Sequence, residues 1–193
     1  MNQKGFTLVE LLATLLIIGV VMGVTIPNVT GIFNQNKVTT YAEDAKKLRT
    51  SAEYMFRGNS AVTKPVANND CIAISLKYLD NDEYKAPYGG KYLDTMSYVI
   101  VRKVNTSSEK KYYYYVQLIE SLPDYGYRGF KIVDARNLDA GGYFDRVGEF
   151  GDTSGFADLK NFVTNPNGLI TSSPQKSFID SICDNVLKVY TPV

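Results

Sequence analysis

The chain has 193 residues, 45% of them hydrophobic, and a formal net charge of +1, which is typical of one folded domain with an additional element. The near-neutral charge predicts no general attraction to nucleic acid, so no nucleic-acid partner is expected. Histidine is absent and no nucleophile motif is present, which excludes Ser-His, Cys-His and His-metal catalysis. We therefore expect no enzyme, cofactor or metal, with carboxylate-only chemistry left open.

The first predicted element is an apolar helix over residues 6–27. Between Phe6 and Pro27 the only ionisable side chain is Glu10, and about 20 apolar residues at 1.5 Å rise are enough to cross about 30 Å of hydrocarbon. Lys4 favours a cytoplasmic N-terminus, so the rest of the chain is expected on the other side of the membrane. A carboxylate at this depth is costly, unless Glu10 snorkels to water at the bilayer edge without a function.

The helical pattern continues past Pro27, so that one helix is expected over about 6–57. Residues 28–58 form its amphipathic half, because apolar side chains recur at spacings of three and four. The stripe consists of Val38, Tyr41, Ala45, Leu48, Ala52 and Met55. Pro27 and Gly31 are expected to break, bend or loosen the helix, and residues 28–36 are poor in helix formers.

Residues 59–193 are expected to form a globular domain. Its predicted elements are a short helix at 71–79 and strands at 97–104, 111–120 and 129–135, with a polar hairpin loop at 105–110. Three successive strands of this kind form an antiparallel meander. Its apolar face needs a partner, and residues 38–56 of the long helix supply one.

Two further helices are predicted towards the C-terminus. The first is short and lies near 156–163. The second begins with Ser173 as N-cap and Pro174 as its first helical residue. Its apolar face consists of Phe178, Ile179, Ile182, Val186 and Leu187. The expected fold class is therefore α+β, with one long N-terminal helix packed on a small antiparallel sheet and a C-terminal helix.

Cys71 and Cys183 are the only cysteines, and both fall in the part expected outside the cytoplasm. An even count in an oxidising compartment favours a disulfide. Such a bond would close a loop of more than 100 residues and stabilise the fold by about 4 to 5 kcal/mol on the chain-entropy model. The alternative is two buried free thiols.

Two other stretches have both a plain and a functional interpretation. Residues 134–158 carry six acids, which suit either a solvated loop, a calcium site without EF-hand spacing, or a contact with the basic part of a neighbour's helix. The acids are Asp134, Asp139, Asp145, Glu149, Asp152 and Asp158. The run from Tyr112 to Tyr115 would point two side chains to each face of a strand, and the outer pair could form a ligand surface.

The N-terminal stretch resembles the class III leader and core helix of type IV pilins and of the related secretion pseudopilins. The matching features are Lys4-Gly5, an aromatic residue at Phe6, the lone acid Glu10 five residues into the mature chain, the apolar run, and Pro27 beyond it. This detailed match covers about 30 residues. The resemblance implies the type IV pilin fold.

The resemblance also implies a pathway of processing and assembly. Residues 1–5 would be a leader that a prepilin peptidase removes between Gly5 and Phe6, with methylation of the new Phe6 amine. The precursor would be a single-pass protein of the cytoplasmic membrane, and the pilus assembly machinery would extract it into an extracellular filament of identical or other pilins. Glu10 of an assembled subunit would then neutralise the Phe6 amine of the next one and set the axial register.

These implications predict a structural subunit of a type IV pilus that supports adhesion, motility or surface colonisation. Three alternatives stay open at this point. Two share the fold: a type II secretion pseudopilin and a competence pilin. The third is a membrane-tethered binding protein that does not polymerise.

Overall fold

The fold is described from a computed structural model. It describes residues 7–60, 62, 64–79, 84–107, 109–124, 126–139, 147–156, 158–159, 179, 181–183 and 187–190, with the backbone alone at 24–31, 139 and 187–189. The chain divides into two compact units, Met1–Lys37 and Val38–Val193.

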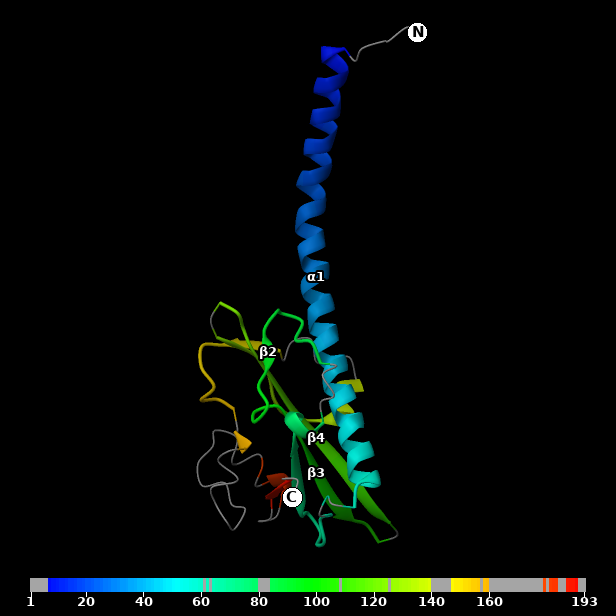
Figure 1. Ribbon diagram of the computed structural model, residues 1–193. Helices are drawn as coiled ribbons and strands as arrows, with labels where there is room; N and C mark the ends of the chain where they lie inside the picture. The colour runs from blue at the N-terminus through cyan, green and yellow to red at the C-terminus, as the bar shows by residue number, and fades with distance from the viewer. Residues whose placement is uncertain are drawn as a thin grey trace. The chain divides into compact units, whose positions relative to one another are not determined.

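Helix α1, Leu8–Gly58, is a single helix of 51 residues and confirms the predicted long N-terminal helix (Figure 1). Its backbone stays helical through Pro27 and Gly31, so the predicted break does not end the helix here. A proline removes only one hydrogen bond of a helix, the one its own N–H would have donated to the carbonyl four residues earlier. The bonds on either side remain, and unwinding within a filament stays a prediction.

The C-terminal half of α1 contributes one side of the core of the Val38–Val193 unit. Tyr41, Ala45, Leu48 and Ala52 are fully buried, as the spacing predicted, and Phe56 extends the same stripe by one turn. These side chains pack in one cluster with residues of the sheet such as Val99, Val101, Val116 and Phe130. The amphipathic half of the helix therefore covers one face of the sheet.

The sheet runs in the order β6-β5-β4-β3-β1-β7, and β2 pairs with β4 off this path. The strands are β1 (Cys71–Ser75), β2 (Lys91–Tyr92), β3 (Tyr98–Asn105), β4 (Lys110–Ser121), β5 (Tyr127–Asp134), β6 (Gly148–Phe150) and β7 (Leu187–Val189). Two 3-10 turns, η1 (Leu76–Tyr78) and η2 (Ala135–Asp139), follow β1 and β5. The antiparallel meander β3-β4-β5 confirms the three predicted strands and the α+β class.

The short helix predicted at 71–79 is wrong. Residues 71–75 form β1, which pairs antiparallel with β3 and parallel with β7, and only the turn η1 that follows is helical. All five residues of β1 are buried. A strand covered on both faces needs a continuous apolar run instead of alternation, and such a run cannot be told from a buried helix by its period.

The C-terminal helix predicted from Ser173 lies largely outside the described residues. Ile179, Ser181 and Ile182 have helical backbone. Leu187, assigned to the apolar face of that helix, instead begins β7, because the chain has by then turned to pair with β1. Most of the short helix predicted near 156–163 also lies outside the described residues.

Cys71 and Cys183 form a disulfide with a Cα–Cα distance of 5.6 Å. Both cysteines are almost fully buried. They lie in a cluster with Ile100, Ile132 and Ile179 on the face of the sheet opposite α1. The bond joins residues 112 positions apart in the sequence. The disulfide therefore holds the C-terminal segment beside β1, the strand with which β7 pairs.

Candidate assembly site

The first turn of α1 is held by a reciprocal cap between Thr7 and Glu10. The backbone N–H and the hydroxyl of Thr7 each donate to Oε2 of Glu10, at 2.9 Å, and the N–H of Glu10 donates to the Thr7 hydroxyl oxygen at 3.3 Å. This is a capping box, in which a threonine and a glutamate three residues later satisfy N–H groups that have no partner within the helix. A carboxylate here also interacts favourably with the helix dipole.

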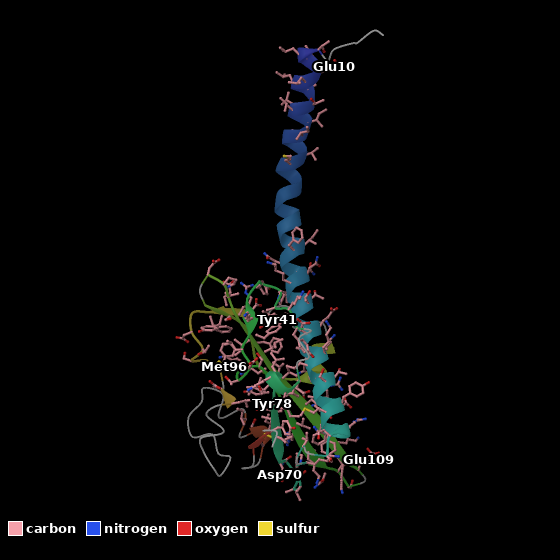
Figure 2. The ribbon with its side chains drawn as sticks, viewed as in Figure 1. Glu10, Tyr41, Asp70, Tyr78, Met96 and Glu109 are labelled. Carbon is pink, nitrogen blue, oxygen red and sulfur yellow. A yellow bond between two sulfur atoms is a disulfide. The ribbon has the colours of Figure 1, made fainter. Side chains whose placement is uncertain are left out.

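The cap leaves one oxygen of Glu10 available. Both donated bonds end on Oε2, and the described residues donate none to Oε1. The side chain is exposed, and Figure 2 shows it at the N-terminal end of the helix. The carboxylate is thus fixed in orientation by its own chain while one oxygen can accept an N–H from another molecule.

The two predicted processing residues, Gly5 and Phe6, lie outside the described residues. The cap begins immediately after them, at Thr7, so removal of a five-residue leader would leave the capping box in the mature chain. The Thr-x-x-Glu spacing was present in the sequence, and reading Glu10 only as a buried charge missed it.

Around Glu10, the surface of α1 is apolar and exposed. Leu8 is 80% exposed and Leu16 63%. The other large apolar side chains of this surface are Val9, Leu11, Leu12, Leu15, Ile17, Ile18, Val20, Val21 and Met22, all at least 49% exposed. An exposed apolar surface of this length marks a site of interaction with another apolar surface.

A search of the described residues for a helix both long enough and apolar enough to cross a membrane finds none.

In the Val38–Val193 unit, two tyrosines join α1 to the sheet through buried or part-buried hydrogen bonds. The hydroxyl of Tyr92, on β2, donates to Oδ2 of Asp44 at 2.9 Å, and that carboxylate is almost fully buried. The hydroxyl of Tyr41 donates to the carbonyl oxygens of Leu118 and Arg128, at 3.2 and 2.8 Å. Burial, with the nearby Tyr41 and Asp44 as lesser causes, raises the pKa of Tyr92 far above its ordinary value, so the hydroxyl stays a donor.

The described part of the chain gives no support to a metal site among the acids of 134–158. No group of three or more His, Cys, Asp or Glu side chains gathers among the described residues. Asp134 instead pairs with Arg136, whose Nε lies 3.0 Å from Oδ1. Asp145 lies outside the described residues.

The tyrosine run alternates as a strand requires. Tyr112 and Tyr114 lie on the face covered by α1, where Phe56 packs edge-on against Tyr112 with the ring centroids 4.8 Å apart. Tyr113 and Tyr115 belong to the cluster on the opposite face. Tyr114 and Tyr115 are buried, and Tyr112 and Tyr113 are half-buried, so the run is chiefly a packing element.

Comparison with known proteins finds one family model and one relative that match part of the chain. The model of the prokaryotic N-terminal methylation motif matches residues 1–26, a stretch that contains Gly5, Phe6 and Glu10. The chain is 57% identical over 90 residues to the ComG operon protein 3 homolog of Bacillus licheniformis, an alignment that covers 39% of this chain and 93% of that protein. No solved structure matches the chain. Because the relative is matched over almost its whole length, the chain belongs to the type IV pilin-like proteins that carry this methylation motif.

Proposed function

We propose that the protein is a structural subunit that polymerises into a type IV pilus-like filament through the apolar N-terminal part of α1. The observation that carries the proposal is a long exposed apolar surface that holds one oriented carboxylate, Glu10, in its first turn. The match of residues 1–26 to the methylation motif supports cleavage after Gly5 by a prepilin peptidase, and assembly with other pilins.

The precursor is proposed to wait in the cytoplasmic membrane, with residues 6–27 in the bilayer, and to move into an extracellular filament. In both environments the apolar side chains from Leu8 to Met22 are removed from water. The amine of Phe6 in an incoming subunit is a cation in an apolar core, and Oε1 of Glu10 in the preceding subunit is the oxygen that can receive it. Any other offset would leave both charges unpaired.

The second candidate is a secretion pseudopilin or a competence pilin, and the similarity to the ComG operon protein 3 homolog favours it. Both candidates use the same processing and the same apolar helix. They differ in what the filament does, so adhesion, motility and surface colonisation are proposals that belong to the first candidate alone.

Two substitutions of Glu10 test the assembly role. Glu10→Ala removes the charge and the cap, whereas Glu10→Gln removes the charge and keeps a capping side chain, because glutamine also completes a capping box. We expect both variants to be processed, as the mass of the mature chain would show, and both to yield no sheared filaments.

Normal filaments from Glu10→Gln together with none from Glu10→Ala would show that the cap, and not the charge, is what assembly needs. Normal filaments from both variants would show that assembly does not need Glu10, whereas an unchanged chain that is processed but absent from sheared filaments would favour a tethered binding protein that does not polymerise.

A further inference from the structure

The N-terminal end of β4 has an edge that no strand covers within the described part of the chain. On one side β4 pairs with β3 from Lys110 to Gln117. On the other side β5 pairs only from Tyr115 onwards, because the chain leaves the sheet after Asp134 and enters η2. Residues 110–114 therefore present alternate backbone N–H and C=O groups at an open edge.

A pocket of about 410 Å³ lies at this stretch of β4. It is bounded by the last turns of α1 and by the start of η2, and most of its charged lining residues are basic. Five cations line it: Arg49, Arg57, Lys110, Lys111 and Arg136. Glu53 is the one acid among the described lining residues, and it pairs with Arg57 at 2.6 Å and with Arg49 at 3.5 Å. Lys111 and Arg136 pair with acids outside the lining, Glu109 and Asp134, so an acidic ligand would share these cations with the chain's own carboxylates.

The cations stand on both faces of the sheet. Arg49, from α1, lies over the ring of Tyr114 with 5.7 Å from Cζ to the ring centroid. Arg136, from η2, lies over the ring of Tyr113 at 4.5 Å. Successive residues of a strand point to opposite faces, so these two guanidinium groups flank the open edge from opposite sides.

Each tyrosine ring that lines the pocket already packs against a side chain of the protein. Arg49 covers Tyr114, Arg136 covers Tyr113, and Phe56 packs against Tyr112. Single-stranded nucleic acids bind chiefly by stacking their bases on open aromatic rings. An open strand edge, by contrast, offers both donors and acceptors, which match a peptide backbone.

We propose that this pocket binds an acidic peptide segment in extended conformation, which adds to the sheet as a short strand along residues 110–114 of β4. Five residues of strand span about 16 Å at about 3.3 Å each. Because cations flank both faces, the segment needs acids at consecutive positions, so that alternate carboxylates meet Arg57 on one side and Arg136 on the other. This inference does not depend on the proposed filament role.

Strand addition can be tested on the ligand, which leaves the protein unchanged. The probe is a fluorescently labelled hexapeptide, Asp-Glu-Asp-Glu-Asp-Glu, titrated with the full chain in a non-ionic detergent and followed by anisotropy. Two further versions carry N-methyl groups, one on alternate amides and one on every amide. In an added strand only one alternate set of amides faces β4, and the all-acid sequence can pair through either set, so the alternately methylated version should keep binding within about twofold and the fully methylated version should lose it.

Charge reversal tests the location. Arg57 is 74% exposed, so Arg57→Glu should leave the fold intact. It should weaken binding of the unmodified peptide by roughly tenfold. Lys131→Glu, an exposed lysine of β5 outside the pocket lining, makes the same change in net charge and should alter binding less than about twofold.

Three results would overturn the proposal. Equal affinities for the two N-methylated versions would show that no strand forms. Equal effects of the two charge reversals would show attraction to net charge without a site. Tighter binding of a fifteen-nucleotide oligothymidylate than of the acidic peptide would assign the pocket to nucleic acid.

Discussion

The two halves of α1 differ in where their apolar side chains find partners. In the C-terminal half, Tyr41, Ala45, Leu48, Ala52 and Phe56 are 0 to 2% exposed, because they pack on the sheet of their own chain. From Leu8 to Met22 the large apolar side chains are 49 to 80% exposed. One half of the helix therefore buries its apolar side chains within the chain, and the other half leaves them exposed.

The polar groups of the two halves follow the same division. Asp44 is buried, and its carboxylate receives the Tyr92 hydroxyl within the chain. Glu10 is exposed, with one oxygen bonded in the cap and the other receiving no bond from the described residues. A buried acid with internal partners stabilises a fold, whereas an exposed acid within an apolar surface is suited to recognise a cation from outside.

Removal of the disulfide should have the largest effect on the folded half. With Cys71→Ala and Cys183→Ala together, we expect the free energy of unfolding to fall by about 4 to 5 kcal/mol, the chain-entropy value for a loop of this length. Denaturant unfolding followed by tyrosine fluorescence measures it, since the chain has 15 Tyr and no Trp. Unchanged stability in the double variant, or free thiols detected in the native protein by alkylation without reductant, would contradict this account.

A matched pair of leucine substitutions compares the two halves directly. Leu48 is fully buried and Leu12 is 58% exposed. Leu48→Ala should lower the free energy of unfolding by about 3 kcal/mol, as cavity-forming changes do. Leu12→Ala should change it by less than about 0.5 kcal/mol and instead reduce the yield of filaments. Equal losses of stability in the two variants would break the division between the halves.

The buried bond between Tyr92 and Asp44 should have a smaller effect. Tyr92→Phe keeps the ring and removes the donor, so we expect a loss of about 1 to 2 kcal/mol from the carboxylate left with one donor fewer. The same denaturation assay measures it. The exposed Tyr54→Phe is the control, and a loss of equal size there would show that the effect is not specific to the buried bond.

The smallest predicted effect concerns pH. Burial is the largest single influence on the pKa of the Asp134 carboxyl, and it acts to raise that pKa. Hydrogen bonds from the side chain and backbone of Arg136, together with the charge of Arg136, outweigh burial and lower the pKa of Asp134 below its ordinary value. A carboxyl with a lowered pKa stabilises the fold above its unfolded pKa of about 4 and loses that contribution as the pH falls through the folded value.

Arg136→Gln should therefore reduce stability at pH 7, and the difference between the two proteins should shrink as the pH is lowered from 7 through the folded pKa of Asp134. The difference at pH 7 should be below about 1 kcal/mol, because Arg136 is 67% exposed and water screens the pair. Denaturation of both proteins across this pH range measures it. A larger difference at low pH than at pH 7 would contradict the predicted sign.

The sequence predicted those elements in which the spacing of hydrophobic residues matches the faces that are buried. The stripe of α1 has one buried face, and β3, β4 and β5 carry turn signals at their ends, so spacing and turns were enough. β1 was assigned wrongly because both its faces are covered, which removes the alternation that identifies a strand. The parallel pairing of β7 with β1 joins residues too far apart in sequence for any local signal.

The candidate site was predicted in part. Gly5, Phe6 and Glu10 lie within a few residues of one another, so their pattern is visible in the sequence, and the methylation-motif model matches the same stretch, residues 1–26. The capping box was readable from Thr7 and Glu10 but was missed. The pocket at β4 could not be predicted, because Arg57, Lys110 and Arg136 meet only once the helix, the strand and η2 are folded together.

The central claim concerns Glu10, and a structure of the assembled filament tests it most directly. We expect the distance from the Phe6 amine nitrogen of one subunit to the nearest carboxylate oxygen of Glu10 in its neighbour to be within about 4 Å, the range of an ion pair. The Thr7 bond to the other oxygen should persist. A filament in which every Glu10 carboxylate contacts only its own Thr7, with the Phe6 amines paired elsewhere, would contradict the account.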